Sequence, residues 1–142
     1  MPVSALPIVN VVVPSPLRRT LDYLAGELDP QPGMRVRVPF GRREVVGVVT
    51  GRAAASDLPR EKLRRIGAVL DSEPVFSPSM RALIEWAASY YHHPLGEVCA
   101  SALPVRLRSA EVAPVREWQF IVIHHSATKV GCAETFDAAH RA

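Results

Sequence analysis

One acidic side chain stands out by its neighbours. Asp22 lies between the apolar residues Leu21 and Tyr23 and follows the basic pair Arg18-Arg19. If it faces a pocket, its carboxylate can accept a hydrogen bond from a free 3′-hydroxyl and repel the phosphate that every internal nucleotide carries there. At about 4 Å this repulsion reaches roughly 4 kcal/mol per unit charge for an effective dielectric of about 20. A solvated charge that balances the arginines is the alternative, and the local sequence leaves both open.

Arginines supply a second kind of chemistry. A guanidinium grips phosphate at two points, and phosphate contacts supply most sequence-independent affinity for nucleic acid. Of the 17 basic residues, 15 are arginine, although a compositional bias explains that excess equally well. A solvated charged surface remains the alternative for each of them. The possible backbone-binding set is Arg37, Arg42, Arg43, Arg64 and Arg65.

Aromatic side chains near these charges could stack on a nucleobase. Phe40 and Tyr23 have suitable positions, but both are as easily core residues. The run Tyr90-Tyr91-His92-His93 invites a metal or stacking interpretation. No nearby carboxylate or thiol completes a metal site, so packing and capping are favoured. We expect no metal centre and no cofactor.

Length and composition indicate one globular domain of ordinary size. The chain has 142 residues, 48% of them hydrophobic, and a net charge of +3, which is ample apolar material for a core. Cys99 and Cys132 form no paired motif, so a reducing cytosol is the simpler assumption. No segment approaches the roughly 18 uninterrupted apolar residues that span a bilayer. We expect a cytoplasmic protein without membrane contact.

Apolar, β-branched runs predict short strands in the first part of the chain. Val36 and Val38 alternate with arginines and should face inward, and the loop Gly41-Arg42-Arg43 should close a hairpin. Arg64 and Arg65 should be exposed. Strands connected in this way predict a small β-barrel-like sheet. The predicted strands are residues 6–13, 34–39, 44–50 and 63–70, with a loop at 53–61.

The hydrophobic period then changes to that of a helix. Ser77 is a suitable N-cap with Pro78 at the first helical position, and His93-Pro94 breaks the helix. A second, shorter helix is predicted over residues 94–103. Strands followed by two packed helices give the fold class α+β. The residues predicted to share one face of the first helix are Met80, Leu83, Ile84, Ala87 and Tyr91.

Four spaced blocks in residues ~6–108 resemble the N-terminal region of the primosomal protein N′ family of bacterial replication-restart helicases. The blocks are PSPLRRTLDY (14–23), GMRVRVPFG (33–41), VLDSEPVF (69–76) and AASYYHHPLG (87–96). The resemblance implies a 3′-DNA-binding domain at residues 1–108 that recognises the 3′-hydroxyl end of the leading strand at a stalled fork.

The resemblance also implies a site. Asp22 would contact the terminal hydroxyl, and Pro39-Phe40-Gly41 would form the opposite wall of a terminal-nucleotide pocket. Arg42 and Arg43 would add supporting charge. Carried over by position, the resemblance implies Leu21, Asp22 and Tyr23, with Gly41 and Arg64 nearby. With Phe40, Arg42 and Arg43, which the residue types suggest, the predicted DNA-binding residues are Leu21, Asp22, Tyr23, Phe40, Gly41, Arg42, Arg43 and Arg64.

The remainder of the chain has a different character. Residues 109–117 read as a linker, and residues 118–141 (WQFIVIHHSATKVGCAETFDAAHR) resemble the opening strand and helix of a zinc-dependent N-acetylmuramoyl-L-alanine amidase. There His124 corresponds to a first zinc ligand, without the further ligands of that family. Residues 118–142 should therefore be an extension that lacks its own core.

The expected function is a non-catalytic module for DNA 3′ ends in replication restart and primosome assembly. The chain has neither the P-loop nor the paired zinc cysteines of the helicase family, so we expect no ATPase activity. The expected partners are DNA with a free 3′-hydroxyl end, other primosome proteins and single-strand-binding protein. A truncated, peptidoglycan-directed zinc amidase is the alternative.

Overall fold

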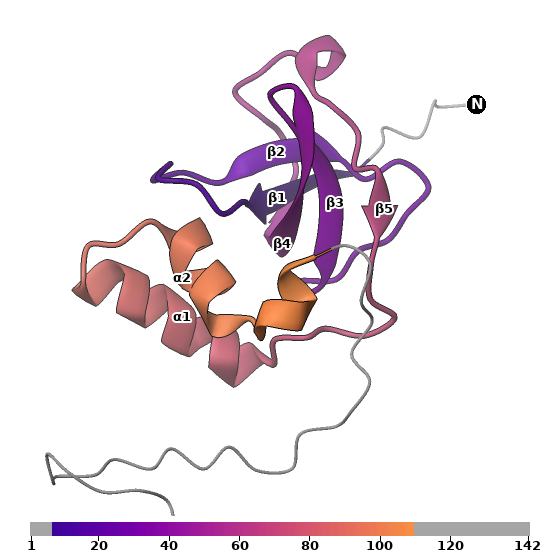
Figure 1. Ribbon diagram of the computed structural model, residues 1–142. Coiled ribbons are helices and arrows are strands. Elements are labelled where there is room, and N and C mark those ends of the chain that lie inside the picture. The colour runs from indigo at the N-terminus through magenta and orange to yellow at the C-terminus, as the bar shows by residue number, and fades with distance from the viewer. Residues whose placement is uncertain (1–6, 110–142) are drawn as a thin grey trace, which may run out of the picture.

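The computed structural model describes residues 7–109 (Figure 1). Their first part forms one antiparallel sheet with the strand order β2-β1-β4-β3-β5. The central β1 and β4 lie between the short edge strands, and helices follow in sequence, so the fold class α+β is confirmed. The strands are β1 (Ile8–Val12), β2 (Leu21–Leu24), β3 (Arg35–Phe40), β4 (Arg43–Ala53) and β5 (Ala68–Val69).

Alternating valines build the core on the inner face of this sheet. Val36 and Val38 are fully buried, whereas Arg37 between them is only half-buried. Because successive strand residues point to opposite faces, this alternation gives the inward orientation predicted from the sequence. Val9 and Val11 of β1 join the same buried cluster.

The sheet is open, so the predicted barrel-like closure is wrong. Its two edges meet only through an isolated parallel bridge between Leu24 and Arg65. The predicted strand over residues 63–70 contains only two strand residues, Ala68–Val69, and β2 has only four. Such short edge strands cannot form the continuous ladder of hydrogen bonds that a barrel needs.

The predicted hairpin is confirmed. In the β3–β4 pair, Phe40 is opposite Arg43, and Gly41 takes a φ of +64° in the turn, a conformation that glycine adopts without steric cost. Strand β4 continues to Ala53, into the start of the stretch predicted as loop. A short 3-10 helix, η1 (Arg60–Lys62), lies in the connection to β5.

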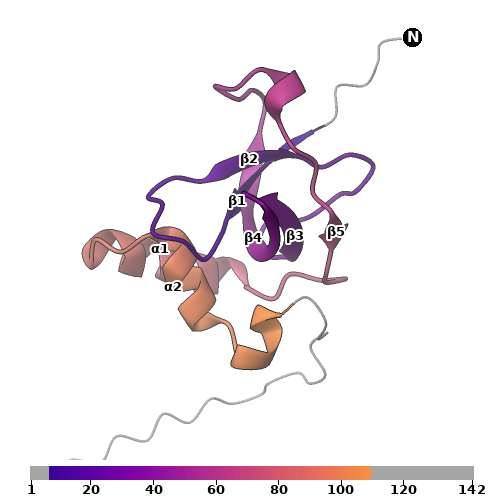
Figure 2. The same cartoon turned by 45° about the horizontal axis from the view of Figure 1, so that its top comes forward.

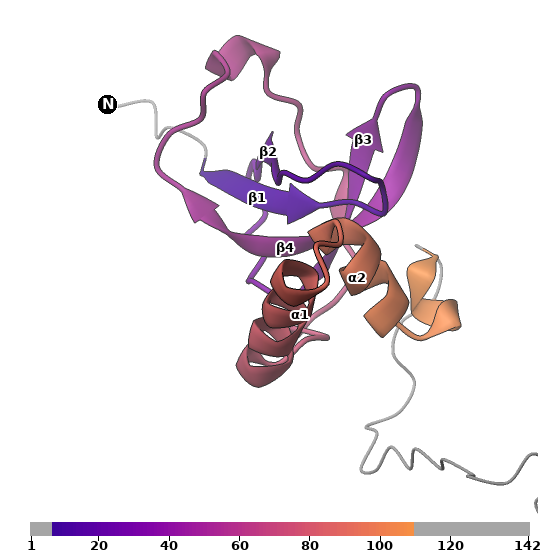
Figure 3. The ribbon, with the colours of Figure 1, turned by 90° about the vertical axis from the view of Figure 1, so that its left-hand side faces the viewer.

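Both predicted helices are present. In α1 (Pro78–Tyr90), the Ser77 hydroxyl accepts a hydrogen bond from the Met80 amide at 3.2 Å, and α2 (Leu95–Ala102) is followed by η2 (Val105–Arg108). Figure 3 shows the two helices against β4. There they bury the outer-face side chains of β1 and β4 in a second core. This core contains Val12, Val48, Phe76, Ile84, Cys99, Leu103 and Leu107.

The buried face of α1 is narrower than predicted. Ile84 and Ala88 are buried, but Leu83 is 54% exposed and Tyr91 is 65% exposed. The helix contacts the rest of the domain along one stripe only, because α2 packs against a single side of it. Of the residues predicted to share one face of the helix, Leu83 and Tyr91 therefore lie outside its buried stripe.

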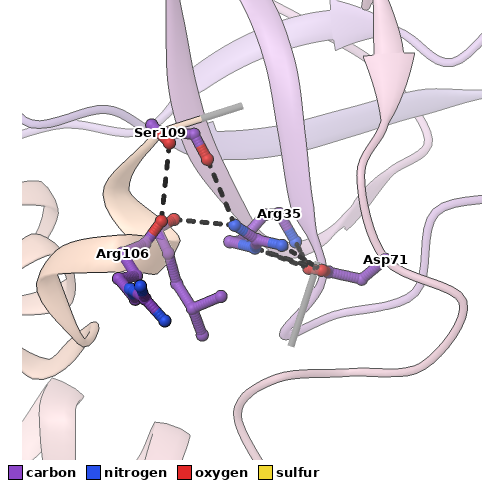
Figure 4. Close-up of polar contacts among 5 residues, drawn as sticks. Arg35, Asp71, Arg106 and Ser109 are labelled. Carbon is purple, nitrogen blue, oxygen red and sulfur yellow. Dashed lines mark hydrogen bonds and ion pairs between the residues drawn. The ribbon is translucent and has the colours of Figure 1, made fainter. Parts of the chain in front are cut away.

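A buried ion pair on β3 fixes the end of η2 (Figure 4). The Arg35 side chain pairs with Asp71, and the distance from Nη2 to Oδ1 is 2.6 Å. Its Nη1 also donates to the Leu107 carbonyl at 2.8 Å and to the Ser109 carbonyl at 3.4 Å. One arginine on β3 thus ties the β5–α1 connection to the end of η2.

Within residues 7–109, none of the helices is long and apolar enough to cross a membrane. Residues 110–142 lie outside the described part. They include most of the predicted linker at 109–117, the amidase-like segment at 118–141 and His124.

Candidate nucleic-acid interface

The Asp22 carboxylate is held in place by two neutral donors. Asn10 Nδ2 donates to its Oδ1 at 2.7 Å, and Ser56 Oγ donates to its Oδ2 at 2.5 Å. Each oxygen therefore retains acceptor capacity. Within residues 7–109, no basic side chain forms an ion pair with Asp22. The carboxylate is oriented without being neutralised.

The backbone explains why Asn10 reaches Asp22. Asn10 lies directly opposite Asp22 in the β1–β2 register and opposite Gly51 in the β1–β4 register. A bulge between Asn10 and Val11 interrupts the second register. The Asn10 amide turns towards β2, where the Asp22 carboxylate accepts its hydrogen bond.

Tyr23 lies on the opposite face of β2 from Asp22, as the alternation of a strand requires. Its ring belongs to the inner core and is only 5% exposed. Its hydroxyl donates to the Pro39 carbonyl at 2.9 Å. Burial raises the pKa of Tyr23, and the charge of Arg64 opposes that rise. Tyr23 therefore anchors β2 to the end of β3, in agreement with the core interpretation.

Arg64 and Gly41 are also brought together. Arg64 Nη1 donates to the Gly41 carbonyl at 3.0 Å, which joins the segment before β5 to the hairpin turn. Leu21 and Phe40 are half-buried against the inner core. The structure thus assembles Tyr23, Gly41 and Arg64 beside Phe40, while the Asp22 carboxylate lies across β2 from them.

The edge of β2 offers backbone groups between the Asp22 carboxylate on one face and the residues around Gly41 on the other. Leu24 donates to the Arg64 carbonyl at 2.9 Å and accepts from the Ile66 amide at 3.0 Å. Peptide groups two residues apart in a strand point to the same side, so those of Asp22 face the same edge. Among residues 7–109, no other strand pairs with β2 at Asp22.

The basic residues differ in how far they are already paired. Arg42 and Arg43 are exposed at the hairpin turn, and neither has a charged partner within residues 7–109. Arg37 instead faces Glu44, with 3.9 Å between Nε and Oε2. Arg64 and Arg65 are exposed, as predicted. The positive charge at this end of the domain is therefore concentrated around Gly41.

The run at the end of α1 is exposed. Tyr90 and Tyr91 are each 65% exposed, so their predicted packing is wrong. The predicted capping is present in the backbone, because the His93 amide donates to the Ala88 carbonyl at 2.9 Å. Within residues 7–109, no cluster of three or more His, Cys, Asp or Glu side chains could hold a metal ion.

Sequence reasoning missed two residues of this interface. Asn10 interrupts the apolar run Ile8–Val12 with an amide. Because buried polar groups need hydrogen-bond partners, an amide in the middle of a buried strand indicates a polar contact. Ser56 had no such signal, because it lies in a polar loop that reaches Asp22 only through the fold.

Comparison of the sequence with known proteins shows the family of this chain. The family described as "3'DNA-binding domain (3'BD)" matches residues 10–104. Replication restart protein PriA of Haemophilus influenzae is 39% identical over 128 residues, which are 87% of this chain and 18% of that protein. Replication restart protein PriA of Buchnera aphidicola subsp. Acyrthosiphon pisum is 32% identical over 103 residues, or 72% of this chain and 14% of that protein.

A third similar protein comes from Mycobacterium tuberculosis. The probable replication restart protein PriA of Mycobacterium tuberculosis is 38% identical over 93 residues, which cover 63% of this chain and 14% of that protein. The chain thus spans less than a fifth of the length of these relatives. It belongs to the family of 3′DNA-binding domains.

Proposed function

We propose that this chain binds the free 3′-hydroxyl end of a DNA strand at the open edge of β2. The observation that carries the proposal is the state of the Asp22 carboxylate. Asn10 and Ser56 fix its orientation, and no basic side chain within residues 7–109 neutralises it. A terminal hydroxyl can donate to an oxygen of Asp22.

The same charge excludes internal nucleotides. A phosphate on the 3′ oxygen would bring a second negative charge to the carboxylate, at a cost of roughly 1 to 4 kcal/mol for a separation of about 4 Å. Asp22 is only half-buried, so the lower part of this range applies. A cost of about 1 to 1.4 kcal/mol changes an affinity by about five- to tenfold.

The terminal nucleotide would lie across the edge of β2. This position lets it meet the Asp22 carboxylate on one face and the residues around Gly41 on the other. The free peptide groups of β2 at Asp22 can hydrogen-bond a base edge, and Leu21 and Phe40 supply partly buried apolar surface. The exposed Arg42 and Arg43 would attract the backbone of the strand, with Arg64 beside them.

The biological role proposed for the chain is that of its relatives, which are named replication restart proteins. It would recognise the leading-strand end at a stalled fork as a non-catalytic domain spanning residues 1–108. Other primosome proteins and single-strand-binding protein are further proposed partners. A cytoplasmic location is part of the same proposal.

Fluorescence anisotropy with short oligonucleotides tests this function. Wild type and Asp22→Ala are each titrated with one sequence that ends in a 3′-hydroxyl or in a 3′-phosphate. Wild type should prefer the hydroxyl end about tenfold, and Asp22→Ala should lose the preference. Asp57→Ala is the matched control, because Asp57 is an exposed carboxylate next to Ser56. Equal affinities in all combinations would refute the proposal.

A further inference from the structure

Three aromatic rings form an exposed cluster at the end of α1. Trp86 is 55% exposed, and Tyr90 and Tyr91 are each 65% exposed. The Trp86 and Tyr90 rings stack with centroids 5.0 Å apart and planes at 19°. Tyr91 meets both rings edge-on at interplanar angles of 81°. The cluster holds its rings in a fixed arrangement while leaving much of their surface open.

A depression at the same end of α1 carries the positive charge of Arg18, and none of the three rings lines it. It has a volume of about 290 Å³ and is lined by Arg18, Ala88, Ser89, His92, His93, Pro94 and Leu95. No carboxylate lines it, although Glu97 approaches His93 with 3.4 Å between Oε2 and Nδ1. Arg18 is exposed and has no charged partner within residues 7–109.

The β1–β2 connection links this depression to the edge of β2. Figures 1 and 2 both show that connection above the turn between α1 and α2. Arg18 precedes Asp22 by only four residues, which is at most about 14 Å of extended chain. A strand whose 3′ end lies at Asp22 can therefore pass over Arg18 within a few nucleotides.

We propose that the aromatic cluster, together with Arg18, binds nucleobases of single-stranded DNA just upstream of the 3′ end. The inference rests on the proposed function, because it extends the same strand from the edge of β2. Stacked rings present π-faces to which any base can bind, and the guanidinium of Arg18 suits a phosphate between two such bases. A carboxylate-free depression favours this anionic partner.

The length dependence of binding tests this inference. A deoxythymidine dinucleotide and an octamer, both with a 3′-hydroxyl, are titrated against the full chain. The octamer should bind wild type roughly tenfold more tightly than it binds the double variant Trp86→Ala/Tyr90→Ala, while both proteins bind the dinucleotide equally. Leu83→Ala is the matched control, because Leu83 is exposed on the same helix but cannot stack on a base.

Tryptophan fluorescence gives an independent readout. The chain has two tryptophans, Trp86 and Trp118, so Trp118→Phe leaves Trp86 as the single probe. The octamer should quench its emission and the dinucleotide should not. Trp86→Phe/Tyr90→Phe keeps the rings and should keep the affinity gain of the octamer, which separates stacking from any folding defect of the alanine variant.

The outcomes are distinguishable from failure of the proposed function. If wild type bound a dinucleotide with a 3′-hydroxyl and one with a 3′-phosphate equally well, the proposed role of Asp22 would fail, whereas the octamer comparison tests the aromatic cluster. The inference would be overturned if Trp86→Ala/Tyr90→Ala kept the affinity gain of the octamer and if the octamer left the Trp86 emission of Trp118→Phe unquenched. In that case the exposed rings would be assigned to a protein partner instead.

Discussion

Arg35 and Asp71 form an ion pair whose side chains are each 1% exposed, across 36 positions of sequence. Asp71 also accepts from the Arg35 backbone amide at 2.8 Å. Three parts of the chain therefore meet at one guanidinium: β3, the segment before α1 and the end of η2. The pair is a buried polar connection between the sheet, the β5–α1 segment and the end of η2.

Asp71→Ala should destabilise the domain by about 3 to 5 kcal/mol, because it removes the buried carboxylate that pairs with the guanidinium of Arg35. Chemical denaturation followed by circular dichroism measures the change. Glu44→Ala is the control, since it removes the exposed partner of Arg37 and should cost less than about 1 kcal/mol. Similar losses of unfolding free energy in the two variants would show that the buried pair stabilises the domain no more than the exposed pair does.

Gly96→Ala should loosen the contact between α2 and β1. A Cβ at residue 96 would lie 1.9 Å from the Val13 carbonyl oxygen, so the helix would have to move. We expect a loss of about 1 to 3 kcal/mol, which is typical of overpacked cores. The thermal midpoint reports it. At Gly51 a new Cβ would meet its nearest atom at 3.8 Å, so Gly51→Ala should be tolerated much better.

Cys99 should make the domain sensitive to alkali. Burial, and secondarily the charge of Glu85, raises the pKa of its thiol to about 11 from an ordinary 9.0. The folded state therefore favours the neutral thiol, and this contribution is complete below pH 9.0 and lost as the pH rises towards about 11. Unfolding free energies measured from pH 8 to 11 should fall less steeply in Cys99→Ala. Parallel profiles would contradict the assignment.

The hairpin arginines should contribute to DNA affinity through phosphate contacts. Arg42→Ala and Arg43→Ala should each lower the slope of log affinity against log salt by about 0.7 for a single strand. Titrations over a series of salt concentrations give that slope. Arg106 is exposed on η2, outside the proposed interface at β2 and the hairpin turn. Arg106→Ala should leave the slope unchanged. Slopes that match wild type in all variants would remove these arginines from the interface.

Local signals in the sequence predicted the elements that depend on local structure. The alternation of Val36 and Val38 located the hairpin, and the Ser77-Pro78 pair located the start of α1. Strand β2 was missed, because its four residues include Asp22 and acquire strand geometry only by pairing with β1. The same reason explains the barrel prediction, since the closure of a sheet depends on how far its distant edges can pair.

The candidate site was predicted in part for a similar reason. The sequence singled out Asp22 by its charge among apolar neighbours, but not Ser56, which reaches it from a loop 34 positions away. The family resemblance also implied that Asp22 lies opposite Pro39-Phe40-Gly41 across a pocket. In the fold, the Asp22 carboxylate and the side chain of Tyr23 lie on opposite faces of β2. This separation follows from the strand geometry of residues 21–24, which they acquire by pairing with β1.

Asp22→Asn gives the most direct test of the account, because it removes the charge while preserving the shape of the side chain. Its affinity for an oligonucleotide ending in a 3′-phosphate should rise above that of wild type by up to about tenfold, as the like-charge repulsion disappears. Its affinity for the matching 3′-hydroxyl end should not rise. A fall in affinity for both ends by the same factor would contradict the proposal that the Asp22 carboxylate selects the 3′-hydroxyl.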